Sequence, residues 1–196
     1  MRADLEEVGC ADLLVSEASS YRLDLEPENI DIRAFTTAAR QLLGDKSMTN
    51  VNFLERADEV RNAWVADPFL GITENRLLTA GRLQLLESRA LLDERCALAH
   101  LSLGQPDRAV DSLRNLLSIE PWRERCWALL MIALYRSGRQ RDAIETFRHA
   151  RSRMINELGI EPGQQLKTIE LMILNQDDNL TGDKLLKQHF APTPPA

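Results

Sequence analysis

Near the start of the chain, apolar and polar positions alternate as they do in a strand. Within residues 12–25, Tyr21, Leu23 and Leu25 alternate with polar neighbours, which predicts one strand of a half-buried β-hairpin. A two-stranded hairpin is only marginally stable by itself in water. We therefore expect this hairpin to pack against the first helices, near Phe35.

Helical spacing replaces alternation after Pro27. From there on, apolar residues recur three and four positions apart, which predicts amphipathic helices. Asp31 and Asn50 are residue types that favour N-caps, and Gly44 marks a helix end. The predicted helices cover residues 31–43, 50–64, about 74–103, 106–118, 141–158 and 164–175.

A repeat with a period of 34 residues organises the middle of the chain. Gly104 recurs as Gly138 and Ala109 recurs as Ala143, which is the spacing of tetratricopeptide repeats. Glycine suits the turn between two helices, and alanine lets the helices of a pair approach closely. The sequence therefore predicts an all-α fold of antiparallel helix pairs, tetratricopeptide-like, preceded by the short β-hairpin.

Charge is unevenly distributed along this acidic chain. The net charge is −6, which argues against electrostatic binding of nucleic acid over the whole protein surface. Residues 108–153, however, hold ten Arg, no Lys and five acidic residues. These arginines are either solvated helix faces paired with nearby acids, or a strip that binds an acidic partner or a nucleic-acid backbone.

Few residues carry catalytic or metal chemistry. The three cysteines and three histidines lack the spacing of a zinc site, and no glycine-rich phosphate loop is present. Asp177, Asn179 and Thr181 resemble part of a calcium loop, but Gln188 stands where that loop needs Glu. We expect no cofactor, no metal and no enzymatic activity. No stretch resembles a secretion signal or a membrane span, so we expect a cytoplasmic protein without membrane contacts.

One stretch closely resembles a known family. Residues 121–163, PWRERCWALLMIALYRSGRQRDAIETFRHARSRMINELGIEPG, resemble the bacterial transcriptional activation domain of the Streptomyces antibiotic regulatory protein (SARP) family of transcription activators. Residues 14–35, LVSEASSYRLDLEPENIDIRAF, resemble that family's junction between the wing of a winged-helix DNA-binding domain and the activation domain. The resemblance implies a winged-helix remnant over 1–28 and the activation domain over 29–176. The polar and then proline-rich composition of residues 177–196 predicts a flexible tail or linker.

The resemblance also implies partners. Family members carry a recognition helix before this point, so we expect specific DNA binding only together with a winged-helix domain, and Arg22 is the one candidate for the DNA backbone. Activation of specialised-metabolite genes, contacts with RNA polymerase subunits and self-association are the implied functions. Aligning the repeats places Leu98, Leu101 and Ile132 near the concave face. The candidate partner-binding residues are Arg123, Arg125, Tyr135, Arg136, Arg139, Arg141 and Arg148.

Two other interpretations stay open. The chain would be a stand-alone tetratricopeptide-type adaptor without a DNA role, or the front end of a larger sensor ATPase regulator joined through the proline-rich stretch APTPPA. Met1 is either the start of a piece of a longer activator or the late start of a partner-binding fragment.

Overall fold

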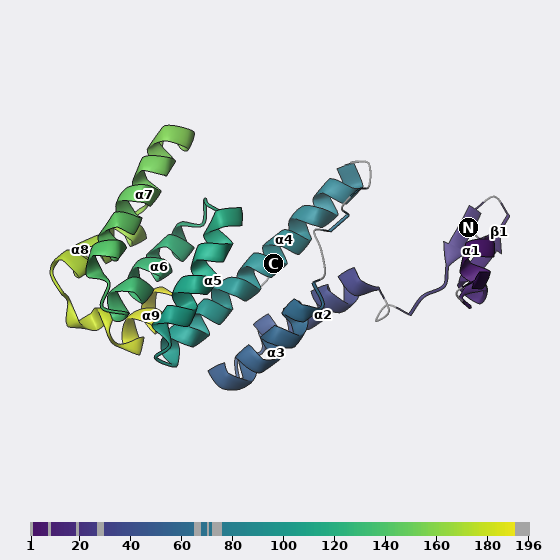
Figure 1. Cartoon of the computed structure of the whole chain (residues 1–196), viewed down its shortest axis with the longest axis horizontal. Helices are drawn as coiled ribbons and strands as arrows, with labels where there is room; N and C mark the ends of the chain where they lie inside the picture. Colours follow the sequence, from purple (N-terminus) through teal and green to yellow (C-terminus); the bar gives the residue numbers. More distant parts are fainter. Residues whose placement is uncertain are drawn as a thin grey trace.

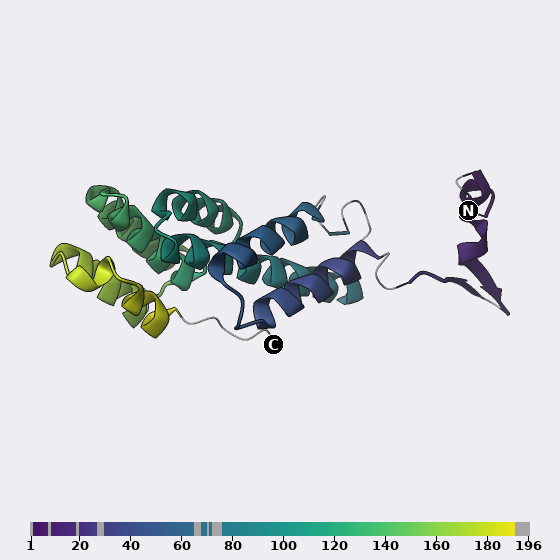
Figure 2. The ribbon, with the colours of Figure 1, turned by 90° about the horizontal axis from the view of Figure 1, so that it is seen from below.

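The N-terminal hairpin stands apart from the helices that follow residue 30 (Figures 1 and 2). The computed structural model describes residues 2–7, 9–18, 20–26, 30–64, 68–69, 71 and 76–190. Strands β1 (Leu14–Glu17) and β2 (Ser20–Leu23) pair antiparallel, after α1 (Arg2–Glu7) and the short 3-10 helix η1 (Ala11–Leu13). The hairpin was expected to pack near Phe35, and this prediction is wrong (Figures 1 and 2). Its alternation is real, but Tyr21 and Leu23 are exposed to solvent.

The first helices build a core of their own. Helices α2 (Asp31–Gly44) and α3 (Asn50–Asn62) pack against α4 (Arg76–Ser102). The ring of Phe35 meets Trp64 edge-on, with 4.9 Å between centroids. The N-cap of α3 is Thr49, whose hydroxyl accepts from the amide of Asn52 (3.3 Å), one residue earlier than predicted. In α2, likewise, Asp31 is the first helical residue rather than the cap.

The predicted repeat of 34 residues is present as two helix pairs. The pairs are α4 with α5 (Pro106–Ile119) and α6 (Glu124–Arg136) with α7 (Gln140–Leu158), arranged side by side in Figure 1. Gly104 and Gly138 occupy the turns with φ of 68° and 75°, where a side chain would strain the backbone. The residue after each glycine makes an equivalent backbone hydrogen bond. The amide of Gln105 donates to the carbonyl of His100, and the amide of Arg139 donates to that of Leu134, both at 2.9 Å.

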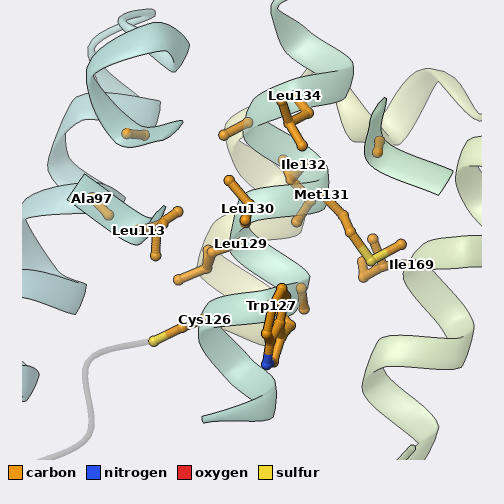
Figure 3. Packing of buried hydrophobic residues seen from close by; sticks show 14 of the residues in the cluster. Ala97, Leu113, Cys126, Trp127, Leu129, Leu130, Met131, Ile132, Leu134 and Ile169 are labelled. Atoms are coloured by element: carbon orange, nitrogen blue, oxygen red, sulfur yellow. The ribbon is translucent and has the colours of Figure 1, made fainter. Parts of the chain in front are cut away.

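The second core surrounds α6 and includes the last helices. Every residue from Cys126 to Leu134 is buried, so α6 is apolar on all sides (Figure 3). Helix α7 ends at Gly159 with φ of 70°, as predicted, and α8 (Gln164–Leu174) packs against α6 and α7. Helix α4 contributes to both cores, because Leu92 and Cys96 face the first while Ala97 and Leu101 face the second.

The C-terminal segment is ordered, which corrects the prediction of a flexible tail from residue 177. The 3-10 helix η3 (Asp178–Leu180) and helix α9 (Asp183–His189) follow α8. Leu180, Leu185, Leu186 and Phe190 are each at most 4% exposed and belong to the second core. These four large apolar residues anchor a segment that is otherwise mainly polar. The APTPPA stretch lies outside the described residues.

Candidate partner-binding surface

The first helices of the pairs, α4 and α6, together with α8 form one face of the repeat, called here the inner face. Segment η3–α9 covers this face: it contacts α4 and α6, and Gln165 of α8 donates its side-chain amide to the carbonyl of His189 (2.9 Å). Leu98, Leu101 and Ile132, predicted near the concave face, are buried in the core. The inner face is therefore occupied by the chain's own C-terminal segment.

Two of the seven candidate residues, Arg123 and Arg125, connect α6 and the turn before it to α4. Arg123 pairs with Glu87, and Arg125 pairs with Glu94, which is itself 7% exposed. The guanidinium of Arg125 also lies 5.3 Å from the ring centroid of Phe190. Both arginines are mostly buried, so they act within the fold rather than as exposed contacts.

The carboxylate of Glu94 also meets the thiol of Cys126. The sulfur lies 3.6 Å from Oε2 of Glu94. Burial first, and the negative charge of Glu94 second, raise the pKa of Cys126 well above its usual range. This thiol therefore stays protonated and unreactive in the folded protein.

Arg136 holds the C-terminal segment on the inner face. It donates Nε–H to the carbonyl of Leu180 (2.7 Å), Nη1–H to that of Leu101 (3.2 Å) and Nη2–H to that of Gly182 (2.8 Å). Its side chain is only 10% exposed. Burial lowers its pKa, and the nearby carboxylate of Asp183 opposes that shift. Arg136 is thus a structural clamp, and the adjacent Tyr135 is half-buried against the same core.

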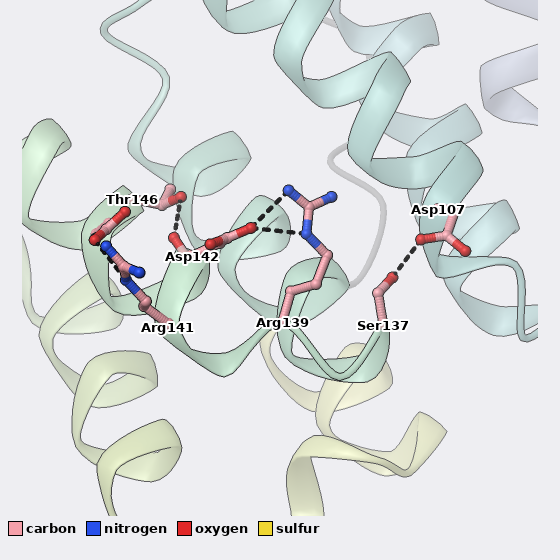
Figure 4. Close-up of polar contacts among 7 residues, drawn as sticks. Asp107, Ser137, Arg139, Arg141, Asp142 and Thr146 are labelled. Atoms are coloured by element: carbon pink, nitrogen blue, oxygen red, sulfur yellow. Dashed lines mark hydrogen bonds and ion pairs between the residues drawn. The ribbon is translucent and has the colours of Figure 1, made fainter.

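The other three candidate arginines belong to α7 and its N-cap, and they are accessible to a partner. Arg139 pairs with Asp142 at 2.6 Å, and Arg141 pairs with Glu145 at 3.0 Å while remaining 87% exposed (Figure 4). Arg148 is exposed seven residues after Arg141, about two helical turns further along α7. These residues form what we call the α7 strip: Arg139, Arg141 and Arg148.

Further along α7, the basic residues are neutralised by local acids. Arg151 makes two bonds to Glu161 (2.8 and 2.7 Å), and Arg153 pairs with Glu157 at 3.0 Å. The hydrogen bond from Arg151 is the main reason that the pKa of Glu161 is lowered. The first interpretation of the basic block, helix faces paired with nearby acids, therefore describes Arg139, Arg141 and Arg153 alike, whose partners are three or four positions away.

On the hairpin, Arg22 is exposed but lies between two carboxylates. It pairs with Glu17 at 3.1 Å and with Asp24 at 3.0 Å. A DNA phosphate would have to compete with both acids, so contact with the DNA backbone stays a prediction.

Sequence reasoning missed the residues that close the inner face. The acids Glu87 and Glu94 stand seven positions apart on α4, a spacing that places them on one helix face. This spacing of the two acids, and the apolar residues after residue 177, were the sequence signals that could have predicted these contacts. In the part of the chain that the structure describes, no group of His, Cys, Asp or Glu side chains could hold a metal ion. No described helix is both long and apolar enough to cross a membrane.

Comparison with known proteins identifies the repeat. The family model described as "Bacterial transcriptional activator domain" matches residues 30–174. Regulatory protein DnrI of Streptomyces peucetius is 32% identical over 86% of this chain and 62% of its own length. Transcriptional regulator RedD of Streptomyces coelicolor is 30% identical over 97% of this chain and 56% of its own length. The chain thus spans a little over half the length of these relatives.

Two further matches extend the comparison. Regulatory protein AfsR of Streptomyces griseus is 34% identical over 86% of this chain but only 17% of its own length. A solved structure, Mycobacterium tuberculosis EmbR in complex with a low-affinity phosphopeptide, has a TM-score of 0.71 at 23% identity and covers 89% of this chain and 47% of EmbR. That likeness shows the fold. The SARP-type relatives and the match over the helical repeat establish that this chain belongs to the bacterial transcriptional activator domain family.

Proposed function

We propose that the chain is the regulatory and activation module of a SARP-type transcription activator, acting through contacts with other proteins in the cytoplasm to control specialised-metabolite genes. The observation that carries the proposal is the family match over residues 30–174, which spans α2 to α8. The β-hairpin precedes this region at the place where the family resemblance puts the wing of a DNA-binding domain. In this proposal, specific DNA binding requires a winged-helix domain with its own recognition helix.

The α7 strip is the surface that we propose for an RNA polymerase subunit. Arg139 and Arg141 are held by acids three and four residues away, and such exposed pairs contribute only about 0.3–0.5 kcal/mol each. Carboxylates of a partner could therefore replace them at little cost. Arg123, Arg125 and Arg136 are not part of the proposed contact, because ion pairs or carbonyl bonds within the fold already engage them.

A transcription assay tests this assignment. The full chain is fused to a heterologous DNA-binding protein, and transcription by actinobacterial RNA polymerase is measured from a promoter carrying that protein's operator. We expect activation by the wild-type fusion and its loss in Arg139→Glu/Arg141→Glu. Arg108→Glu/Arg114→Glu, which makes the same change in net charge on exposed residues of α5, should activate normally.

Two outcomes would contradict the proposal at different levels. Normal activation by Arg139→Glu/Arg141→Glu would show that the α7 strip is not the contact with RNA polymerase, while leaving the proposed activator function intact. A wild-type fusion that never activates, together with affinity capture of a partner unrelated to transcription, would favour the stand-alone adaptor. Self-association, the other proposed contact, is measured by sedimentation of the full chain over a range of concentrations.

A further inference from the structure

A small pocket lies where α9 meets the rest of the fold. Its volume is about 190 Å³, and it opens between the start of α3, the second half of α4, and α9. Leu98, Leu186 and Phe190 supply its apolar lining. A cavity of about 150 Å³ is large enough for a benzene ring, so this pocket has room for a ring-sized apolar group and a polar substituent.

The polar lining of the pocket consists of groups that donate hydrogen bonds. Arg95 and Lys187 contribute positive charge, Ser102 contributes a hydroxyl, and Asn50 contributes a side-chain amide. The amide oxygen of Asn50 already accepts from Nη2 of Arg95 (2.8 Å), which leaves its NH₂ group as a donor. Among the described residues that line the pocket, none carries a carboxylate side chain.

Arg95 differs from the half-buried arginines of α6 and the turn before it. Arg123, Arg125 and Arg136 each lie beside a carboxylate, whereas no described acidic side chain lies within ion-pair distance of Arg95. Its guanidinium lies 4.5 Å from the ring centroid of Phe53. Burial lowers its pKa, and no carboxylate opposes that shift. A charge removed from water is costly without a counter-ion, so the pocket favours an anion.

We propose that this pocket binds a small organic anion, a carboxylate or a phosphate monoester carried on a ring-sized apolar group. The anionic end lies against Arg95 and Lys187, and the apolar end lies among Leu98, Leu186 and Phe190. Because Arg95 belongs to α4 and Lys187 to α9, the ligand joins the C-terminal helix to the repeat. Its binding therefore favours the arrangement in which the inner face is covered.

Calorimetric titration of the full chain tests the chemistry with four probes. Benzoate and phenyl phosphate combine charge with a ring, benzamide keeps the ring without the charge, and inorganic phosphate keeps the charge without the ring. We expect at least one of the first two to bind and to raise the melting temperature. We expect benzamide and inorganic phosphate to bind about tenfold more weakly or worse. Failure of both ring anions, or equal binding of benzamide, overturns the proposal.

Variants locate the site. Arg95→Gln should weaken binding of the ring anion by about tenfold or more, since a charge-assisted hydrogen bond is lost. Because Arg95 also packs on Phe53, Lys187→Gln is the safer second variant, since Lys187 is exposed. We expect it to weaken binding roughly threefold. Its matched control is Lys184→Gln, on the same helix but outside the pocket. Equal affinities for the Lys187 and Lys184 variants would refute the assignment.

Discussion

Truncating Phe190 to alanine tests whether the C-terminal segment is part of the folded core. The ring is 1% exposed within the second core, and the guanidinium of Arg125 lies 5.3 Å from its centroid. Removing a buried phenylalanine side chain costs about 3–5 kcal/mol. In a protein of this size, that loss lowers the melting temperature by about 6–20 °C.

Urea unfolding followed by circular dichroism gives the free energy of unfolding and its slope with denaturant. Leu174→Ala is the matched control, because Leu174 is 55% exposed at the end of α8 and should lose less than about 0.5 kcal/mol. We expect Phe190→Ala to move the midpoint far more than this control. A midpoint within the control's range would show that α9 is detached in solution and would refute the packing described for it.

Three further predictions concern the repeat and a buried thiol. Phe147→Ala should cost about 3–5 kcal/mol in the same urea experiment, because this residue of α7 is 5% exposed and belongs to the second core; an unchanged midpoint would exclude Phe147 from the core. Gly138→Ala should lower the melting temperature through about 1–2 kcal/mol of backbone strain, since φ is 75° while the space around its Cβ is open. Burial raises the pKa of Cys96 to about 12, so its alkylation by iodoacetamide at pH 8 should require unfolding. The stability that this thiol contributes is fully present below its unfolded pKa of about 8.5 and declines as pH rises toward 12; rapid alkylation in native conditions would contradict its burial.

The repeat could be predicted from the sequence because its signals are local. Gly104 and Gly138 mark turns by a conformation that glycine adopts readily, and Ala109 and Ala143 repeat at the same offset. The glycines indicate the conformation of their own backbone, and the alanines indicate a close contact with the neighbouring helix. The helix boundaries followed to within a few residues, including the end of α7 at Gly159.

The ordered tail and the hairpin's position could not be predicted in this way. After residue 177 the composition is polar, and four anchors such as Leu180 and Phe190 become visible only when the inner face that receives them is known. The hairpin has a strand pattern, but nothing in that pattern says whether its apolar residues are covered, and Tyr21 is exposed. Both cases depend on whether distant segments pack together: the C-terminal segment packs on the repeat, and the hairpin stands apart from it (Figures 1 and 2).

The roles of the arginines depended on partners far along the chain. Arg125 and Arg123 pair with acids 31 and 36 positions away, and Arg136 bonds to carbonyls 35 to 46 positions away. The partners of Arg139 and Arg141 are three and four positions away. The arginines of this block therefore divide into a structural group, whose partners are distant in the sequence, and an exposed group, whose partners are close. Counting charges along the sequence cannot separate the two groups, because it does not show which distant segments meet.

The burial of α6 also determines what the family signature can report. The motif RERCWALLMIALYRSGRQ, one of those that carry the resemblance, is centred on a helix with nine consecutive buried residues. Residues with no surface cannot distinguish one binding partner from another, so a motif centred on them reports how the helix packs and not what the protein contacts. Contacts with a partner must therefore involve exposed positions outside α6, which in the proposal above are the exposed arginines of α7.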